Sequence, residues 1–215
     1  MRVKICGITR VEDAVVAADA GADAVGLIFV PSSPRYISPE SAARIVRALP
    51  QTITPVGVFV NESREEIGRV VARSGVRALQ LHGEESPEAT IGFTIPVIKS
   101  FRVGEEFSVE SVRGYPVSAI LLDALVPGLY GGTGKTFDWN IAIAAKAYGR
   151  VILSGGIHAE NVSDAIRSVR PYAIDVNSGV ESSPGIKDPE KIAALFRAVR
   201  DAEPGGEPHI HNFPA

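Results

Sequence analysis

The sequence predicts an α/β fold, a single (β/α)8 barrel with parallel strands, and three observations lead to this prediction. Apolar segments that fit buried strands alternate about eight times with segments that fit helices. Polar residues stand repeatedly where the predicted strands end. The chain has 215 residues, which suits the small end of the size range of such TIM barrels.

The first two strand–helix pairs have clear local signals. Residues 3–6 are short, apolar and β-branched, and an Ala-rich helix over residues 12–20 follows a capping-box pattern that starts at Thr9. A second buried strand over residues 24–30 leads to a helix that opens at Ser38, with proline as its first helical residue. These signals predict two complete strand–helix units.

The later elements continue the alternation. A fragmentary repeat supports them, because residues 20–25 and 74–79 both fit a helix end, a glycine and a strand start. A doubly wound open sheet is the alternative, but its usual glycine-rich turn does not follow the first strand. The predicted strands cover residues 56–60, 78–82, 97–101, 119–123, 151–154 and 173–177, and the predicted helices cover 64–73, 105–113, 139–148, 159–169 and 189–200, with a weak helical stretch after Ser86-Pro87.

Composition excludes several classes of function. The 22 basic and 25 acidic residues give a net charge of −3, so we expect no nucleic-acid surface and no polybasic membrane patch. One cysteine excludes an intramolecular disulfide and a multi-cysteine metal site. No apolar run suits export or a membrane span, so the expected location is cytoplasmic.

The end of the chain differs from the rest in composition. Residues 202–215 contain three prolines, two glycines and little that could pack, so we predict a barrel over residues 1–201 and a flexible, disordered tail. His209 and His211 could bind a metal weakly, although a solvated tail is the favoured interpretation.

In such a barrel, function lies at the C-terminal ends of the strands. Polar residues at or near these predicted ends are therefore the candidates. They are Cys6, Arg35, Asn61, His82, Lys99, Asp123, Ser154 and Asn177.

Cys6 is a candidate base. A free cysteine is more often a small buried hydrophobic residue, and a thiolate base needs positive charge nearby. Lys4 should face the same way along the strand and could supply that charge, or it could pair with Asp175 deeper in the barrel.

Asp123 ends an otherwise apolar strand. A carboxyl group there is suited to donate a proton, although a structural aspartate bound to loop amides is the alternative. The first and sixth strands should face each other with space for a small sugar, so Cys6 and Asp123 would form the acid–base pair of a proton-shuttling isomerisation.

The two loops after the seventh and eighth strands contain small residues. Gly155 and Gly156 in one loop, and Ser178 and Gly179 in the other, would let backbone N–H groups approach an anion. Ordinary turns are the alternative, but the positions favour a phosphate site.

Three further features have weaker signals. The glycine-rich run 131–136 fails the spacing of a nucleotide-binding loop and is better interpreted as a mobile lid. Arg35 could hold a carboxylate by a bidentate contact or be a solvated loop residue. His82 is a weak substrate-binding candidate, and no second histidine is placed to share a metal with it.

Nine motifs now form a recognisable series. The chain closely resembles phosphoribosylanthranilate isomerase of tryptophan biosynthesis, from residue 1 to about residue 200. The motifs are KICGIT (4–9), GLIF (26–29), SPRYI (33–37), GVFVN (57–61), LQLHG (79–83), LD (122–123), GGTGKTFDW (131–139), LSGG (153–156) and DVNSGVE (175–181).

The resemblance implies an Amadori rearrangement of N-(5-phosphoribosyl)anthranilate without cofactor or metal, in a monomer or homodimer. It implies that Cys6 is the general base, that Asp123 is the general acid and that Arg35 contacts the anthranilate carboxylate. It also implies that the two small-residue loops bind the phosphate. Asn177 departs from the family pattern, in which a second serine or another small residue is common at that place.

Two other functions remain as alternatives. Indole-glycerol-phosphate synthase, another phosphosugar barrel, would need a lysine acid, and Lys99 is the only strand-end candidate. A non-catalytic binder of phosphoribosyl ligands would be expected to lack Cys6 or Asp123, and both are present.

Overall fold

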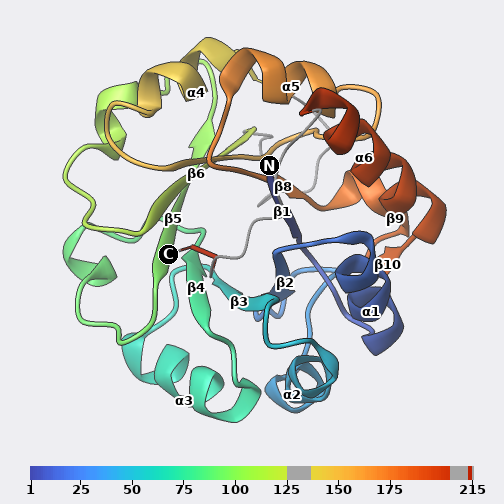
Figure 1. Cartoon of the computed structure of the whole chain (residues 1–215). Coiled ribbons are helices and arrows are strands. Elements are labelled where there is room, and N and C mark those ends of the chain that lie inside the picture. The colour runs from blue at the N-terminus through green and yellow to red at the C-terminus, as the bar shows by residue number, and fades with distance from the viewer. Residues whose placement is uncertain (125–136, 204–212, 215) are drawn as a thin grey trace.

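Eight parallel strands close into a barrel in the computed structural model, which describes residues 1–124, 137–203 and 213–214. Each strand pairs with the next, and β1 also pairs with β8. Figure 1 shows the helices arranged in a ring outside the strands. The strands are β1 (Arg2–Ile5), β2 (Ala24–Ile28), β3 (Thr54–Phe59), β4 (Ala78–Leu81), β5 (Val97–Val103), β6 (Ala119–Ala124), β7 (Val151–Leu153) and β8 (Ala173–Val176). The predicted barrel is confirmed.

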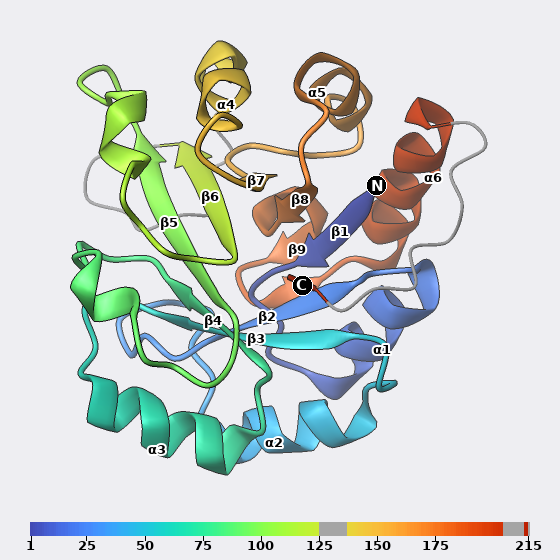
Figure 2. The same ribbon diagram turned by 60° about the vertical axis from the view of Figure 1, so that its left-hand side comes forward.

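The helices surround the barrel unevenly. Figure 2 shows α2 and α3 on one side of the strands, opposite α4, α5 and α6. The α-helices are α1 (Val11–Ala20), α2 (Pro39–Ala48), α3 (Arg64–Ser74), α4 (Trp139–Ala145), α5 (Val162–Val169) and α6 (Pro189–Ala202). Short 3-10 turns follow β4, β5 and β8, namely η1 (Glu88–Thr90), η2 (Val109–Val112) and η3 (Ser178–Val180).

The helix predicted over residues 105–113 is wrong, because only the single turn η2 forms there. The Ser108 side chain accepts from the Glu110 N–H at the start of this turn. Gly114, at φ 86°, and Pro116 follow directly and prevent a longer helix. An antiparallel hairpin of β9 (Glu181–Ser183) and β10 (Ile186–Lys187) was also not predicted.

The predicted helix ends are correct in three places. Ser38 is the N-cap of α2 and accepts from the Ser41 N–H. Gly21 and Gly75 end α1 and α3 in the left-handed region, at φ 107° and 75°. The capping box at Thr9 is wrong, because the N-cap of α1 is the next residue and the Thr9 hydroxyl instead donates to the Gly185 carbonyl, at 2.5 Å.

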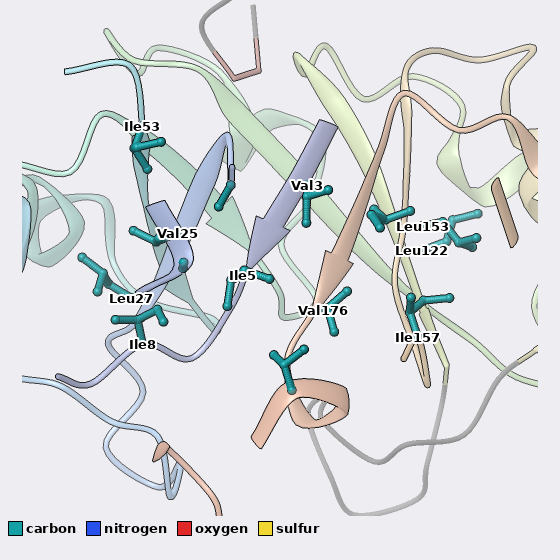
Figure 3. Packing of buried hydrophobic residues seen from close by; sticks show 14 of the residues in the cluster. Val3, Ile5, Ile8, Val25, Leu27, Ile53, Leu122, Leu153, Ile157 and Val176 are labelled. Atoms are coloured by element: carbon teal, nitrogen blue, oxygen red, sulfur yellow. The ribbon is translucent and has the colours of Figure 1, made fainter. Parts of the chain in front are cut away.

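Two apolar clusters stabilise the barrel, one on each face of the strands. The larger cluster contains side chains of the strands and of the helices, so it lies between them. Figure 3 shows some of its members, among them Ile5, Leu27, Leu122, Leu153 and Val176. The smaller cluster lies inside the barrel, where the strands begin. It contains Ala24, Val56, Ala78, Ile98, Ala119, Leu121, Ile152, Ala173 and Phe213. Because side chains alternate along a strand, this interior cluster shows which residues point inward.

Phe213 is part of the predicted tail, yet it packs against the barrel. Only 1% of it is exposed, its ring stacks on Tyr172 at 6.1 Å, and its N–H donates to the Thr54 hydroxyl at 3.3 Å. Figure 1 shows this end of the chain inside the ring of helices. Among the described residues, no helix is long and apolar enough to cross a membrane.

Candidate active site

Alternation from the interior cluster places the candidate acid and base at the opposite end of the barrel. Asp123 lies four residues beyond inward-facing Ala119, and His82 lies four beyond inward-facing Ala78. Cys6 follows β1 directly, and its N–H donates to the Val176 carbonyl at 2.8 Å, so it extends the pairing with β8. These side chains are buried at the C-terminal mouth.

Lys4 and Asp175 form an ion pair beside Cys6. They are direct partners across β1 and β8, and the Lys4 Nζ lies 2.8 Å from the Asp175 Oδ1. Both are buried. A Cβ added to Gly26 would lie 2.6 Å from the Cys6 sulfur and 3.1 Å from the Lys4 Nζ. The sulfur and the ammonium group therefore occupy space that only glycine leaves open, and the pairing predicted for Lys4 is confirmed.

Burial and charge oppose each other at this thiol. Burial raises the pKa of Cys6, and the charge of Asp175 adds to the effect, whereas the ammonium groups of Lys4 and, to a smaller extent, Lys187 oppose it. The net result is a pKa above the usual thiol value. For Lys4, burial lowers the pKa, but the Asp175 carboxylate and the Cys6 sulfur together outweigh it, so the pKa of Lys4 is raised and the lysine stays charged.

His82 lies beside Asp123, where the sequence suggested no partner for this carboxyl group. The His82 Nε2 is 3.4 Å from the Asp123 Oδ2, and its Nδ1 is 2.8 Å from the Gln80 Nε2. When the Gln80 amide donates to Nδ1, the neutral ring carries its proton on Nε2, which faces Asp123. His82 is thus in the site, and its expected contact with substrate remains a prediction.

The two small-residue loops contact each other next to Asp123. Gly155 has a φ of 79°, and a Cβ there would lie 2.5 Å from the Ala124 nitrogen and 3.1 Å from the Asp123 Oδ1. A Cβ at Gly179 would overlap the Ile157 carbonyl. A small cavity between the loops is lined by Asp123, Ser154, Gly155, Gly156, Ile157, Asp175, Asn177, Ser178 and Gly179. Asp175 thus connects this cavity to the Lys4 and Cys6 side of the mouth.

Arg35 is buried in a charged cluster that sequence reasoning did not predict. Its Nε and Nη2 donate to the Glu181 carboxylate at 2.9 and 2.7 Å. The Lys187 Nζ donates to the same carboxylate at 2.9 Å and to the Asn177 Oδ1 at 3.0 Å. Glu181 stands in the quoted DVNSGVE motif, but nothing in the sequence indicates its partner 146 positions away.

This cluster shifts the pKa values of two of its members. Burial alone would raise the pKa of Glu181, but hydrogen bonds and charge from Arg35 and Lys187 outweigh it and lower the pKa. Burial lowers the pKa of Lys187, and the Glu181 carboxylate only partly opposes this effect.

Two strand-end candidates make contacts with the loop after β4. Lys99 follows inward-facing Ile98 and therefore lies on the outer face of β5, where its Nζ donates to the Gly83 carbonyl at 2.8 Å and pairs with Glu85 at 3.1 Å. It is not at the strand end, because β5 continues to Val103. Asn61 accepts from the Glu84 N–H in a neighbouring loop.

Two other expectations concern segments that the structure does not describe. The proposed lid over residues 131–136 and the pair His209 and His211 lie outside the described residues. Within the described ranges, no cluster of three or more His, Cys, Asp or Glu side chains could hold a metal ion.

The site therefore has two chemically distinct sides. A buried thiol with an adjacent ammonium group can exchange a proton on one side, and a carboxyl group beside an imidazole can do so on the other. On the shorter way around the barrel, β7 and β8 separate β6 from β1. The loops that follow β7 and β8 are rich in small residues. This arrangement suits proton transfer at two atoms of one small, anionic substrate.

Comparison with known proteins gives a consistent match over nearly the whole chain. The family model described as N-(5'phosphoribosyl)anthranilate (PRA) isomerase matches residues 3–198. The N-(5'-phosphoribosyl)anthranilate isomerase of Citrifermentans bemidjiense is 52% identical over 199 residues, which are 93% of this chain and 97% of that protein.

Two solved structures show the same fold. One is described as mutually generated monomers of the dimeric phosphoribosylanthranilate isomerase from Thermotoga maritima, with a TM-score of 0.82 and 44% identity, covering 94% of this chain and 99% of that chain. The other is a phosphoribosyl anthranilate isomerase in complex with reduced 1-(o-carboxyphenylamino)-1-deoxyribulose 5-phosphate. It has a TM-score of 0.82 and 43% identity, with coverage of 94% and 99%.

Proposed function

This chain belongs to the N-(5'-phosphoribosyl)anthranilate isomerase family, and on that premise we propose which of its residues perform the reaction. The enzyme is an aldose–ketose isomerase of L-tryptophan biosynthesis. It converts N-(5-phosphoribosyl)anthranilate to 1-(2-carboxyphenylamino)-1-deoxyribulose 5-phosphate. The rearrangement opens the ribose ring and moves a proton from C2.

Cys6 is the general base of this proposal, and Asp123 is the general acid. Asp123 protonates the ring oxygen as its bond to C1 breaks, and the Cys6 thiolate then removes the proton from C2, which leaves an enolamine. The enolamine becomes the ketone when C1 gains a proton and the C2 hydroxyl loses one. The charged Lys4 beside the sulfur stabilises the thiolate that proton removal from C2 needs. The observation that carries the proposal is that both groups are buried at the same end of the barrel and face its interior.

The remaining residues hold the two ends of the substrate. Gly155 and Gly156, with Ser178 and Gly179, bind the phosphate through backbone N–H groups, and their close approach leaves no room for side chains at two of these positions. Arg35 contacts the anthranilate carboxylate. His82 contacts the sugar from beside Asp123.

Turnover of single variants tests the acid and the base. Because a positioned acid or base contributes about 10²–10⁴-fold, we expect Cys6→Ala and Asp123→Asn each to lower kcat at least about 100-fold without unfolding the protein. The consumption of fluorescent substrate measures kcat, and circular dichroism checks the fold. Near-normal turnover in either variant would remove that residue from its role.

Location and assembly complete the proposal. We expect the enzyme to work in the cytoplasm as a monomer or homodimer. The relative from Thermotoga maritima, described as dimeric, supports the second form. Sedimentation equilibrium separates the two states.

A further inference from the structure

Arg35 is held by one edge of its guanidinium group. A guanidinium can bind a carboxylate through its Nε–Nη2 edge or through the edge formed by its two terminal nitrogens. Glu181 takes the first edge, with its oxygens 2.9 and 3.2 Å from Nε and 2.7 Å from Nη2. Nη1 makes no hydrogen bond to a described residue, so the terminal edge keeps donors for a second carboxylate.

Glu181 is fixed independently of Arg35. Its carboxylate also accepts from the Lys187 Nζ at 2.9 Å and from the Gly185 N–H at 3.1 Å. The hairpin that carries Glu181 is attached to α1, because the Lys187 N–H donates to the Asp13 Oδ2 at 3.0 Å. Glu181 can therefore act as a rigid support for Arg35 rather than move with it.

The Arg35 side chain passes beside Gly7, the residue that follows the proposed base. A Cβ added to Gly7, the residue after Cys6, would lie 2.8 Å from the Arg35 Cδ and 2.6 Å from the Asn177 Oδ1. The Arg35 side chain thus crosses Gly7 at the barrel mouth. Its cluster with Glu181 and Lys187 contains two cations and one carboxylate, so a second carboxylate would balance its charge.

We propose that Glu181 is a positioning residue for substrate specificity, which holds Arg35 so that its terminal edge receives the aromatic carboxylate of the substrate. This inference rests on the proposed role of Arg35. Without Glu181, the long Arg35 side chain would be free to move and would lose rotamer freedom when substrate binds. The substrate carboxylate would therefore be bound less tightly. The phosphate and sugar contacts would not change.

Two stable ligands measure this effect by calorimetry. One is the reduced product analogue with its carboxylate, and the other is the same compound with an unsubstituted phenyl ring. The ratio of their Kd values, here called the carboxylate preference, isolates the carboxylate contact from all other contacts. The variants are Glu181→Asp, which keeps the charge but shortens the side chain, Glu181→Gln, Arg35→Met and the double variant Arg35→Met with Glu181→Asp. Ser183→Ala, at an exposed position of the same hairpin, is the matched control.

We expect Glu181→Asp and Glu181→Gln each to reduce the carboxylate preference about tenfold, in the range of one charge-assisted hydrogen bond, and Ser183→Ala to leave it unchanged. Binding of the phenyl ligand should stay within about twofold, which also shows that each variant is folded. Adding Glu181→Asp to Arg35→Met should have no further effect, because Glu181 acts only through Arg35.

Two results would overturn the inference. An unchanged preference in both Glu181 variants would show that Arg35 needs no support. A stronger preference would show that Glu181 competes with the substrate for Arg35. If Arg35→Met itself leaves the preference unchanged, the proposed carboxylate contact of Arg35 fails, which is a different result from the failure of the Glu181 variants alone.

Discussion

The chemistry of single residues in this site is set by burial. Cys6 is a thiol in a nearly dry environment, and the pKa of the group rises because the charged form loses its water. A raised pKa makes the thiolate a stronger base but leaves less of it at neutral pH. Lys4 offsets part of this effect because its ammonium group stays charged next to Asp175.

The pH dependence of kcat/KM follows from the raised pKa of Cys6. Because Cys6 must be a thiolate and Asp123 a protonated acid in the same molecule, kcat/KM should be bell-shaped, with one limb at the pKa of Cys6, which burial raises above the usual thiol value. The chain has one cysteine, so thiolate absorbance near 240 nm reports this pKa directly. A profile with neither limb at the titrated thiol pKa would contradict Cys6 as the base, and Cys6→Ser provides the spectroscopic blank.

At this scale, the sequence predicts the positions of groups that share a strand or stand at equivalent strand ends. Cys6, Asp123 and the pairing of Lys4 with Asp175 follow from side-chain alternation and from the position of strands in a barrel. The partner of Arg35 could not be found in this way. Glu181 reaches it from a hairpin whose Pro184-Gly185 turn is visible in the sequence but whose strands, of three and two residues, have no strand pattern, and the contact joins residues far apart in the chain.

At the scale of elements, the loops after β7 and β8 depend on close backbone contact. Gly155 is at φ 79°, and any side chain there would meet the backbone of Ala124 and the carboxylate of Asp123. Gly114 has a similar φ of 86°, but an added Cβ would have nothing within 4 Å. A side chain would therefore be strained by the positive φ at both positions, but it would collide with neighbouring atoms only at Gly155.

We expect Gly155→Ala to lower kcat by at least about tenfold, because a carboxylate displaced by a fraction of an ångström loses its alignment with the substrate. Gly114→Ala should lower the free energy of unfolding by about 1 kcal/mol, because alanine is strained at a positive φ, and it should leave kcat unchanged. Urea unfolding and steady-state kinetics on both variants measure the two effects. Equal kcat in both variants would show that the contact with Asp123 is unimportant.

Element prediction succeeded where strong local signals were present. The strands were predicted from apolar runs, and α2 from its Ser-Pro start, with ends correct to a few residues. The failure over residues 105–113 has a local cause, since the following glycine and proline limit the segment to one turn. Thr9 failed as a cap because its hydroxyl binds Gly185 in the hairpin, which is a tertiary contact.

At the scale of the whole molecule, the two ends of the barrel interior differ in chemistry. Polar and charged side chains line the C-terminal mouth, whereas apolar side chains fill the other end. Phe213 is the largest side chain of this second cluster and comes from the far end of the chain. The composition of residues 202–215 gave no indication of this contact, because a single aromatic residue in a polar segment has no periodicity.

Removing this side chain should destabilise the barrel. We expect Phe213→Ala to lower the free energy of unfolding by about 3 kcal/mol, the lower end of the range for buried phenylalanine. Ile91→Ala, at a position with 55% exposure, should change it by less than about 0.5 kcal/mol. Urea unfolding measures both. A Phe213→Ala protein as stable as the wild type would show that the segment does not dock in solution.

The proposed mechanism requires one substrate to lie between the Cys6 sulfur and the Asp123 carboxyl group. A crystal structure of this protein with the reduced product analogue measures both distances at once. We predict the Cys6 sulfur at about 3.5 Å from the carbon that corresponds to C2, with the Asp123 carboxyl group on the opposite side of the same sugar chain, within hydrogen-bond distance of one of its oxygens. A ligand that contacts only one of the two groups would contradict the mechanism.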